Sequence, residues 1–223
     1  MSTTLRRFVS FRTSVLLAAL LFVAGHSWAL HFDHAVVARY VQDKHGGQGV
    51  ERVSRWFALL RRHAGTTDHQ ALLVGVNAFW NGTIREGVDR DIWKQEDYWA
   101  TPVETLVRGM ADCEDFVIGK YFSLVHLGVD PEKLRLVYVR ARIGGQSIAH
   151  MVLGYYETPQ SEPLVLDNLM GSIVPAGQRW DLQPVFSFNA QGVYVAGARS
   201  APVSQISRWQ GLISRMQREG FLF

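Results

Sequence analysis

The sequence predicts an α+β fold in which a group of helices precedes an antiparallel sheet. Apolar residues recur at helical spacing through the first half of the chain, and short apolar or alternating runs separated by turn residues fill the second half. The order of these patterns is the third observation, because helices followed by strands are typical of α+β domains.

Four segments of the first half are predicted to be helices. They are residues 50–65, 67–82, 101–109 and 113–127, the last closed by Gly128. The third has clear start signals, with Thr101 as N-cap, Pro102 at the first helical position and Glu104 completing a capping box. Residues 83–100, rich in charged and aromatic side chains, are expected to form an irregular loop.

The second half is predicted to supply the strands and one closing helix. The expected strands are residues 133–141, 147–157, 163–168, 184–188 and 193–197, the last two forming a hairpin. Residues 204–220 place apolar side chains on one helical face, which indicates a helix that packs against the rest of the fold.

Residues 1–29 have the pattern of a secretory signal peptide. Three arginines precede the apolar run 15–24, and small residues follow at positions that a signal peptidase reads. The alternative is an uncleaved anchor, but a membrane-spanning helix needs about 20 apolar residues. We therefore expect export, no permanent membrane anchor, and one mature domain over residues 30–223.

Charge and cysteine content exclude several classes of protein. The chain holds 23 Lys+Arg and 20 Asp+Glu, and residues 1–29 contain three of the arginines and no acid. The mature chain is thus formally neutral, with no basic run, so we expect no nucleic-acid binding. A single cysteine cannot form an internal disulfide.

That cysteine, Cys113, lies at the predicted start of a helix between Asp112, Glu114 and Asp115. Free N–H groups at a helix start favour a thiolate, whereas neighbouring carboxylates oppose it. Cys113 could be a buried structural thiol or a nucleophile. An exposed free thiol is a chemical liability in an oxidising compartment, which favours a functional role.

Two further residues could complete a catalytic triad with Cys113. His150 lies within an apolar predicted strand, and Asp167 ends the next one. Either alone is more typical of a structural residue. In this order, however, a helix packed across adjacent strands can bring a nucleophile, a base and an orienting acid together.

The motifs around these residues resemble a known family. "DCED", "AHMVLGYY" and "LVLDNL", with "DYWATPVETLVRG" upstream and "PVFSFN" downstream, are similar to the bacterial transglutaminase-like cysteine proteinases, the LapG-type periplasmic adhesin proteases. One departure is Met110-Ala111, where glycine-rich sequence is expected. The resemblance implies a papain-like, transglutaminase-like fold and a Cys113-His150-Asp167 triad.

The resemblance also implies a biological task. Such a protease acts in the periplasm, cuts the N-terminal region of a large surface adhesin beside a pair of alanines, and thereby promotes biofilm dispersal. An inner-membrane receptor for cyclic di-GMP is implied as the inhibitor.

Calcium is the expected cofactor. Three acids around a thiol oppose the thiolate that the reaction needs, and a bound cation reverses their effect. Calcium accepts 6–8 oxygen ligands with flexible geometry, which suits Asp112 and Glu114 together with backbone carbonyls and water. The resemblance implies a calcium dependence carried by these two acids, and we add Asp115.

Three alternatives stay open on the sequence alone. One is a peptidoglycan hydrolase of the NlpC/P60 kind, although that family prefers Asp-Cys-Ser-Gly at the cysteine. Another is a binding module that has kept the fold without the chemistry. The third is a metal-binding protein that uses histidines, whose spacing matches no zinc pattern; these are His31, His34, His63 and His69.

Overall fold

The computed structural model describes residues 30–223, so the predicted signal peptide at residues 1–29 lies outside the described residues. The helices are α1 (His34–Lys44), α2 (Gly47–His63), α3 (His69–Thr83), α4 (Asp89–Ile92), α5 (Pro102–Arg108), α6 (Cys113–His126) and α7 (Ser207–Arg218). No helix of the described part is long and apolar enough to cross a membrane.

The strands form one large antiparallel sheet and two small pairs. The large sheet has the order β10-β9-β8-β4-β5-β6-β7. Its strands are β4 (Leu134–Ile143), β5 (Gln146–Tyr155), β6 (Leu164–Leu166), β7 (Val174–Pro175), β8 (Leu182–Asn189), β9 (Gly192–Val195) and β10 (Ala198–Ala201). The pairs are β1 (His31–Phe32) with β11 (Phe221–Leu222), and β2 (Arg85–Glu86) with β3 (Met110–Ala111).

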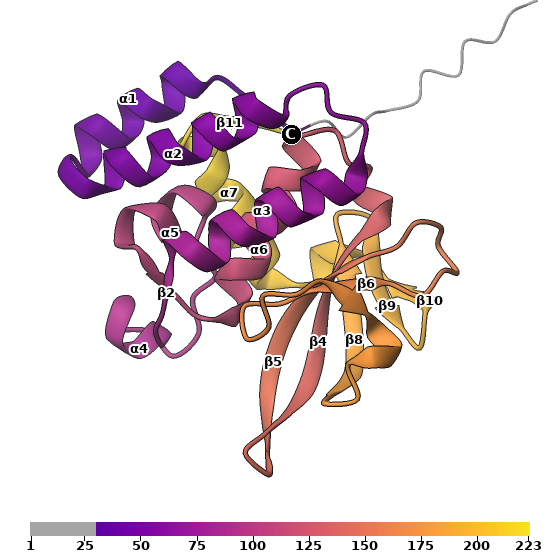
Figure 1. The fold of residues 1–223 in the computed structure, drawn as a ribbon. Coiled ribbons are helices and arrows are strands. Elements are labelled where there is room, and N and C mark those ends of the chain that lie inside the picture. Colours follow the sequence, from indigo (N-terminus) through magenta and orange to yellow (C-terminus); the bar gives the residue numbers. More distant parts are fainter. Residues whose placement is uncertain (1–29) are drawn as a thin grey trace, which may run out of the picture.

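Helices and sheet form two parts of the molecule, joined by α6. Figure 1 shows α1, α2, α3 and α5 gathered on one side and the sheet on the other, with β4 and β5 projecting away from the helices. Residues of α6 from Glu114 to Val125 are all buried. The main core therefore runs from the helices, through α6, to one face of the sheet.

The predicted α+β arrangement is confirmed, and several local signals act as expected. Thr101 and Glu104 form the capping box of α5, and Gly109 ends that helix with a left-handed φ of 69°. Asp68 caps α3 by accepting the Ala71 N–H. The predicted hairpin forms as β8 and β9, where Asn189 pairs with Gly192.

Other elements differ from the prediction. Helix α1 was not expected, because only Val37 and Val41 are buried on it and its apolar stripe is narrow. Residues 83–100 are not wholly irregular, since they contain β2 and α4. Both are too short to leave a periodic signal.

A buried serine fixes α6 against two other helices. The Ser123 hydroxyl accepts the indole N–H of Trp56 at 2.9 Å and that of Trp80 at 3.0 Å, and donates to the Gly119 carbonyl at 2.7 Å. Gly119 leaves room for the Trp80 ring, which lies 2.5 Å from where a Cβ would stand. The approach of α3 to α6 thus depends on a glycine in the middle of α6.

We expect Gly119→Ala to destabilise the protein by about 1–3 kcal/mol, because the new methyl group overlaps the Trp80 ring in a packed core. Thermal unfolding measures the effect. Gly82→Ala in α3 is the matched control, since nothing lies within 4 Å of its added Cβ. Equal melting temperatures for the two variants would contradict this account of the α3–α6 contact.

Candidate active site

Cys113 is the first residue of α6, and the residues before it are held in place by backbone pairing. Met110 and Ala111 form β3, which pairs in parallel with β2. Asp112 occupies the N-cap position, as predicted, but its side chain makes no capping hydrogen bond. The Met110-Ala111 departure from a glycine-rich loop therefore corresponds to a short strand, and Asp112 Oδ1 is left without a hydrogen-bond partner in the described residues.

The Cys113 thiol lies between an acid and the edge of β5. It donates a hydrogen bond to Glu114 Oε2 at 3.0 Å, and the backbone N–H of Met151 on β5 favours the thiolate by lowering the thiol pKa. Burial raises the pKa of the Cys113 thiol strongly, and the nearby Glu114 and Asp112 carboxylates raise it further. The thiol is therefore held protonated by its carboxylate neighbours.

His150 and Asp167 are in direct contact. His150 lies on β5 and is buried; Asp167 follows β6 and is also buried. The distance from His150 Nε2 to Asp167 Oδ1 is 2.8 Å. Because Nε2 is occupied by the carboxylate, Nδ1 is the ring nitrogen left to exchange a proton. His150 is also the neighbour on β5 of Met151, whose backbone N–H favours the Cys113 thiolate.

The Asp167 carboxylate has a complete set of donors. Besides His150, the Arg179 guanidinium donates to Oδ2 at 2.8 Å and the Leu169 N–H to Oδ1 at 3.0 Å. Burial alone raises the pKa of Asp167, but the hydrogen bonds and charges of His150 and Arg179 outweigh it and lower the value to about 2. Asp167 thus stays ionised. The Asn81 amide also donates to its backbone carbonyl at 2.7 Å.

Three carboxylates gather beside the thiol, and they differ in part from the predicted set. Asp89, Asp112 and Glu114 offer ligand atoms that all lie within 4.8 Å of one another, the one such group in residues 30–223. Asp115 is not part of this group: its Oδ1 accepts the Ala100 N–H at 2.7 Å, and its Oδ2 is buried without a partner in the described residues. The sequence reasoning therefore missed Asp89. It lies in a short helix, and nothing in the sequence distinguishes it from the acids around it.

The chemistry of this donor set fits a divalent cation. Asp89 Oδ1 and Asp112 Oδ1 are buried without a hydrogen-bond partner in the described chain. Burial and the charges of Glu114 and Asp89 raise the pKa of Asp112 to about 9. Three clustered carboxylates with unpaired buried oxygens are unfavourable unless they share protons or bind a cation. Asp89, Asp112 and Glu114 are the residues that could hold calcium.

The other predicted metal ligands and aromatic candidates have structural surroundings. In residues 30–223 the four histidines of the alternative metal site form no ligand group; His34 stacks on Phe57, and His69 bonds Tyr155. The Trp80 indole is engaged by Ser123. Trp93 and Trp99 carry buried indole N–H groups without a partner in the described residues.

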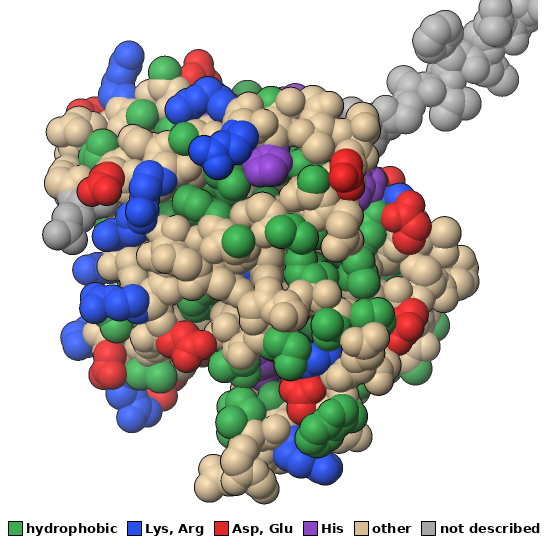
Figure 2. Space-filling model, in the orientation of Figure 1, with side chains coloured by type: hydrophobic (Ala, Val, Ile, Leu, Met, Phe, Trp, Pro, Cys, Tyr) green, Lys and Arg blue, Asp and Glu red, His purple; other side chains and the backbone are tan. Residues whose placement is uncertain are grey.

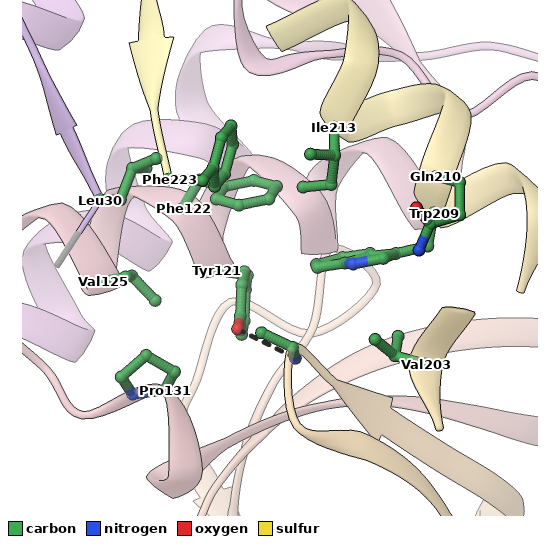
Figure 3. A pocket seen from close by; sticks show the side chains of 11 residues that line it. Leu30, Tyr121, Phe122, Val125, Pro131, Val203, Trp209, Gln210, Ile213 and Phe223 are labelled. Atoms are coloured by element: carbon green, nitrogen blue, oxygen red, sulfur yellow. Dashed lines mark hydrogen bonds between the residues drawn. The ribbon is translucent and has the colours of Figure 1, made fainter. Parts of the chain in front are cut away.

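The surface is hollowed between the two parts of the molecule. Figure 2 shows this hollow at the lower edge, between the helical part and the projecting strands. A separate apolar pocket of about 230 Å³ lies between α6 and α7 (Figure 3). Tyr121, Phe122 and Trp209 line it, and none of the triad or carboxylate residues does.

Comparison with known proteins gives a consistent result. The family model of the bacterial transglutaminase-like cysteine proteinases matches residues 58–180. Legionella pneumophila LapG is 37% identical with a TM-score of 0.73, covering 84% of this chain and 99% of that one. The EGTA-treated form of that protein is 36% identical with a TM-score of 0.73, covering 84% of this chain and 100% of that one. The calcium-bound form is 38% identical with a TM-score of 0.71, covering 82% of this chain and 99% of that one. A search of curated protein sequences gives no match.

These matches show that the fold is the transglutaminase-like fold of cysteine proteinases, as the sequence predicts. The chain belongs to the bacterial transglutaminase-like cysteine proteinase family. The family model spans Cys113, His150, Asp167 and Arg179. Arg179 is the second residue that sequence reasoning missed, because an arginine just outside a predicted strand carries no signal of a contact with a buried acid.

A buried cation lies in the same region. Lys120 of α6 is fully buried, and its Nζ has no hydrogen-bond partner in residues 30–223. Burial lowers the pKa of Lys120 to about 7, and the charge of Asp167 only partly opposes this. Below pH 7 the folded protein therefore holds a poorly solvated ammonium, which is unfavourable.

We expect Lys120→Met to raise the melting temperature by roughly 4 °C at pH 6, equivalent to about 1–2 kcal/mol. Between the folded pKa of about 7 and the ordinary value of 10.5, the unfolded chain binds more protons, so wild-type stability rises with pH. The advantage of the variant should therefore shrink toward pH 10. Exposed Lys44→Met is the control, and an advantage independent of pH would contradict the explanation.

Proposed function

We propose that this protein is a calcium-dependent cysteine endopeptidase with a Cys113-His150-Asp167 triad. The observation that carries the proposal is the position of Cys113: it begins α6 beside the edge of β5, the strand that bears His150, while His150 is held by Asp167 at 2.8 Å. Family membership supports the reaction class.

Each residue of the proposed triad has its own role in the reaction, as in other sites with a nucleophile, a base and an orienting acid. Cys113 Sγ attacks the peptide carbonyl carbon, and His150 takes the thiol proton and gives it to the departing amine. The resulting thioester is then hydrolysed by water, which restores the thiol. The Cys113 N–H, free at the start of α6, is a suitable donor to the negative oxygen of the tetrahedral intermediate.

Asp167 keeps His150 in the orientation that this exchange needs. Because it accepts from Nε2, the proton-transfer atom is Nδ1. Arg179 and the Leu169 N–H keep Asp167 ionised and fixed, so its charge can stabilise the imidazolium that forms when the thiol is deprotonated.

Calcium held by Asp89, Asp112 and Glu114 would supply positive charge beside the thiol. Without a cation, the Cys113 proton is directed to Glu114 rather than to His150, and the carboxylates raise the thiol pKa. Ligation of Glu114 removes that acceptor and neutralises the opposing charge. The calcium-bound and EGTA-treated forms of the similar LapG support this choice of metal.

The substrate, partner and location are proposed from the family resemblance. The enzyme would act in the periplasm after removal of residues 1–29, and would cut the N-terminal region of a large surface adhesin near a double alanine. Release of the adhesin would promote biofilm dispersal. An inner-membrane cyclic di-GMP receptor would inhibit the enzyme by binding it.

We expect Cys113→Ala and His150→Ala to reduce cleavage of adhesin N-terminal fragments by at least 10³-fold, and Asp167→Asn to reduce it by at least tenfold. Fragment cleavage on gels, with mapping of the cut site, measures this. A parallel assay on peptidoglycan tests the hydrolase alternative. Wild-type cleavage by Cys113→Ala would overturn the assignment, provided that its melting temperature is unchanged.

We expect EGTA to stop proteolysis and added calcium to restore it. Calcium at a hundred times its Kd should also stabilise the fold by about 2.7 kcal/mol, visible as a rise in melting temperature. Asp89→Asn should abolish both effects, since it removes one of the three clustered carboxylates. Asp91→Asn, exposed on the same short helix, is the matched control. Retention of the calcium-dependent rise by Asp89→Asn would place the cation elsewhere.

A further inference from the structure

The edge of β5 next to the thiol has no strand partner. On that side β6 pairs only with Leu153, Gly154 and Tyr155. Within residues 30–223 no strand covers Gln146–Val152 on that edge, although β4 pairs with the whole length of β5 on the other edge. Figure 1 shows β4 and β5 projecting well beyond β6.

The free hydrogen-bonding groups of this edge can be assigned from the register of the β4–β5 hairpin. Ile143 and Gln146 flank a two-residue turn, Gly144-Gly145, in which both residues have positive φ, so these two residues form a hydrogen-bonded pair. Because alternate residues direct their N–H and C=O groups to the same edge, those of Ser147, Ala149 and Met151 point away from β4. Ser147 and Ala149 are exposed, and neither has a partner there in the described chain. The row of free groups thus begins two residues from Met151, whose N–H acts on the pKa of the Cys113 thiol.

An apolar pocket adjoins the same edge. It has a volume of about 370 Å³ and is lined by side chains of β4, β5 and β8, among them Tyr138, Ala149 and Phe186. The Tyr138 and Phe186 rings stack with centroids 4.7 Å apart, and both line this pocket. Tyr138 pairs with Met151 in the sheet; burial raises the pKa of Tyr138, and the charge of Glu114, the residue after the nucleophile, raises it further.

We infer that β5 binds the polypeptide substrate in extended form, as an added strand whose backbone pairs with Ala149 and Ser147 and whose apolar side chain sits over Tyr138 and Phe186. This deepens the proposed function and rests on Cys113 being the nucleophile. An added strand on this edge begins beside the Cys113 sulfur, so pairing also positions a peptide carbonyl for attack. The free edge, its exposed groups and the pocket are continuous with the reactive thiol, which favours a substrate peptide as the occupant.

Alkylation of Cys113 tests this without an adhesin. Acetyl-Ala-Ala-Ala chloromethyl ketone carries a peptide backbone, whereas iodoacetamide does not. The rate of Cys113 alkylation by each reagent is divided by the rate at which the same reagent alkylates glutathione, which removes differences in intrinsic reactivity. In calcium-containing buffer we expect this normalised rate to be at least tenfold higher for the peptide reagent than for iodoacetamide. An analogue with N-methylated backbone amides should lose this preference, because it cannot donate to the β5 edge.

Variants of the chain give the matching result from the protein side. Ala149→Pro removes an N–H that faces the free edge, so pairing with β4 is retained. It should lower the peptide reagent's preference at least tenfold while leaving iodoacetamide alkylation within twofold. Phe186→Ala should lower the preference severalfold, and Ile143→Ser, exposed at the far end of β4, should not change it.

The inference is overturned if the N-methylated reagent reacts with the wild-type protein as fast as its parent, whatever the stability of the variants. It is also overturned if folded Ala149→Pro keeps the full preference. Failure of adhesin cleavage alongside a retained preference would instead contradict the proposed substrate and leave the strand pairing supported.

Discussion

Burial of α6 is the constraint on which the site depends. A helix enclosed from Glu114 to Val125 cannot shift along its axis without disrupting the core on every side. Ser123 holds two tryptophans from α2 and α3 against it, and Gly119 sets how closely α3 approaches. The first turn of α6 is therefore fixed relative to β5, which places a thiol beside a strand edge with little freedom to move.

The same burial creates the electrostatic conflict at the start of α6. Burial raises the pKa of both the Asp112 carboxyl and the Cys113 thiol, and the neighbouring Glu114 carboxylate raises both pKa values further. At Asp167 the opposite holds, because two basic side chains and a backbone N–H satisfy the carboxylate. The Asp167 carboxylate is thus fully satisfied by groups of the protein, whereas the carboxylates at the start of α6 form a donor set suited to a cation.

Much of this arrangement could be predicted where the signal is local. The capping box of α5, the start of α6 and the order of helices and strands follow from short patterns that the structure reproduces. Asp89 and Arg179 could not be found this way, because their roles arise from contacts with residues far away in the sequence. Asp115 was predicted as a ligand from its place beside Cys113, but it lies outside the group of clustered carboxylates, and its Oδ1 accepts the Ala100 N–H.

The projecting strands also bear on self-association. An unpaired strand edge can accept a strand from another copy of the same chain as readily as any other peptide, and exposed Ile143 and Ile148 add apolar surface to it. Arg140 and Arg142 lie exposed on β4 in the same region. When two copies approach, these like charges repel, and such repulsion is a common means of preventing edge-to-edge aggregation. The arginines thus disfavour pairing between copies while leaving the edge itself open to an uncharged or acidic peptide.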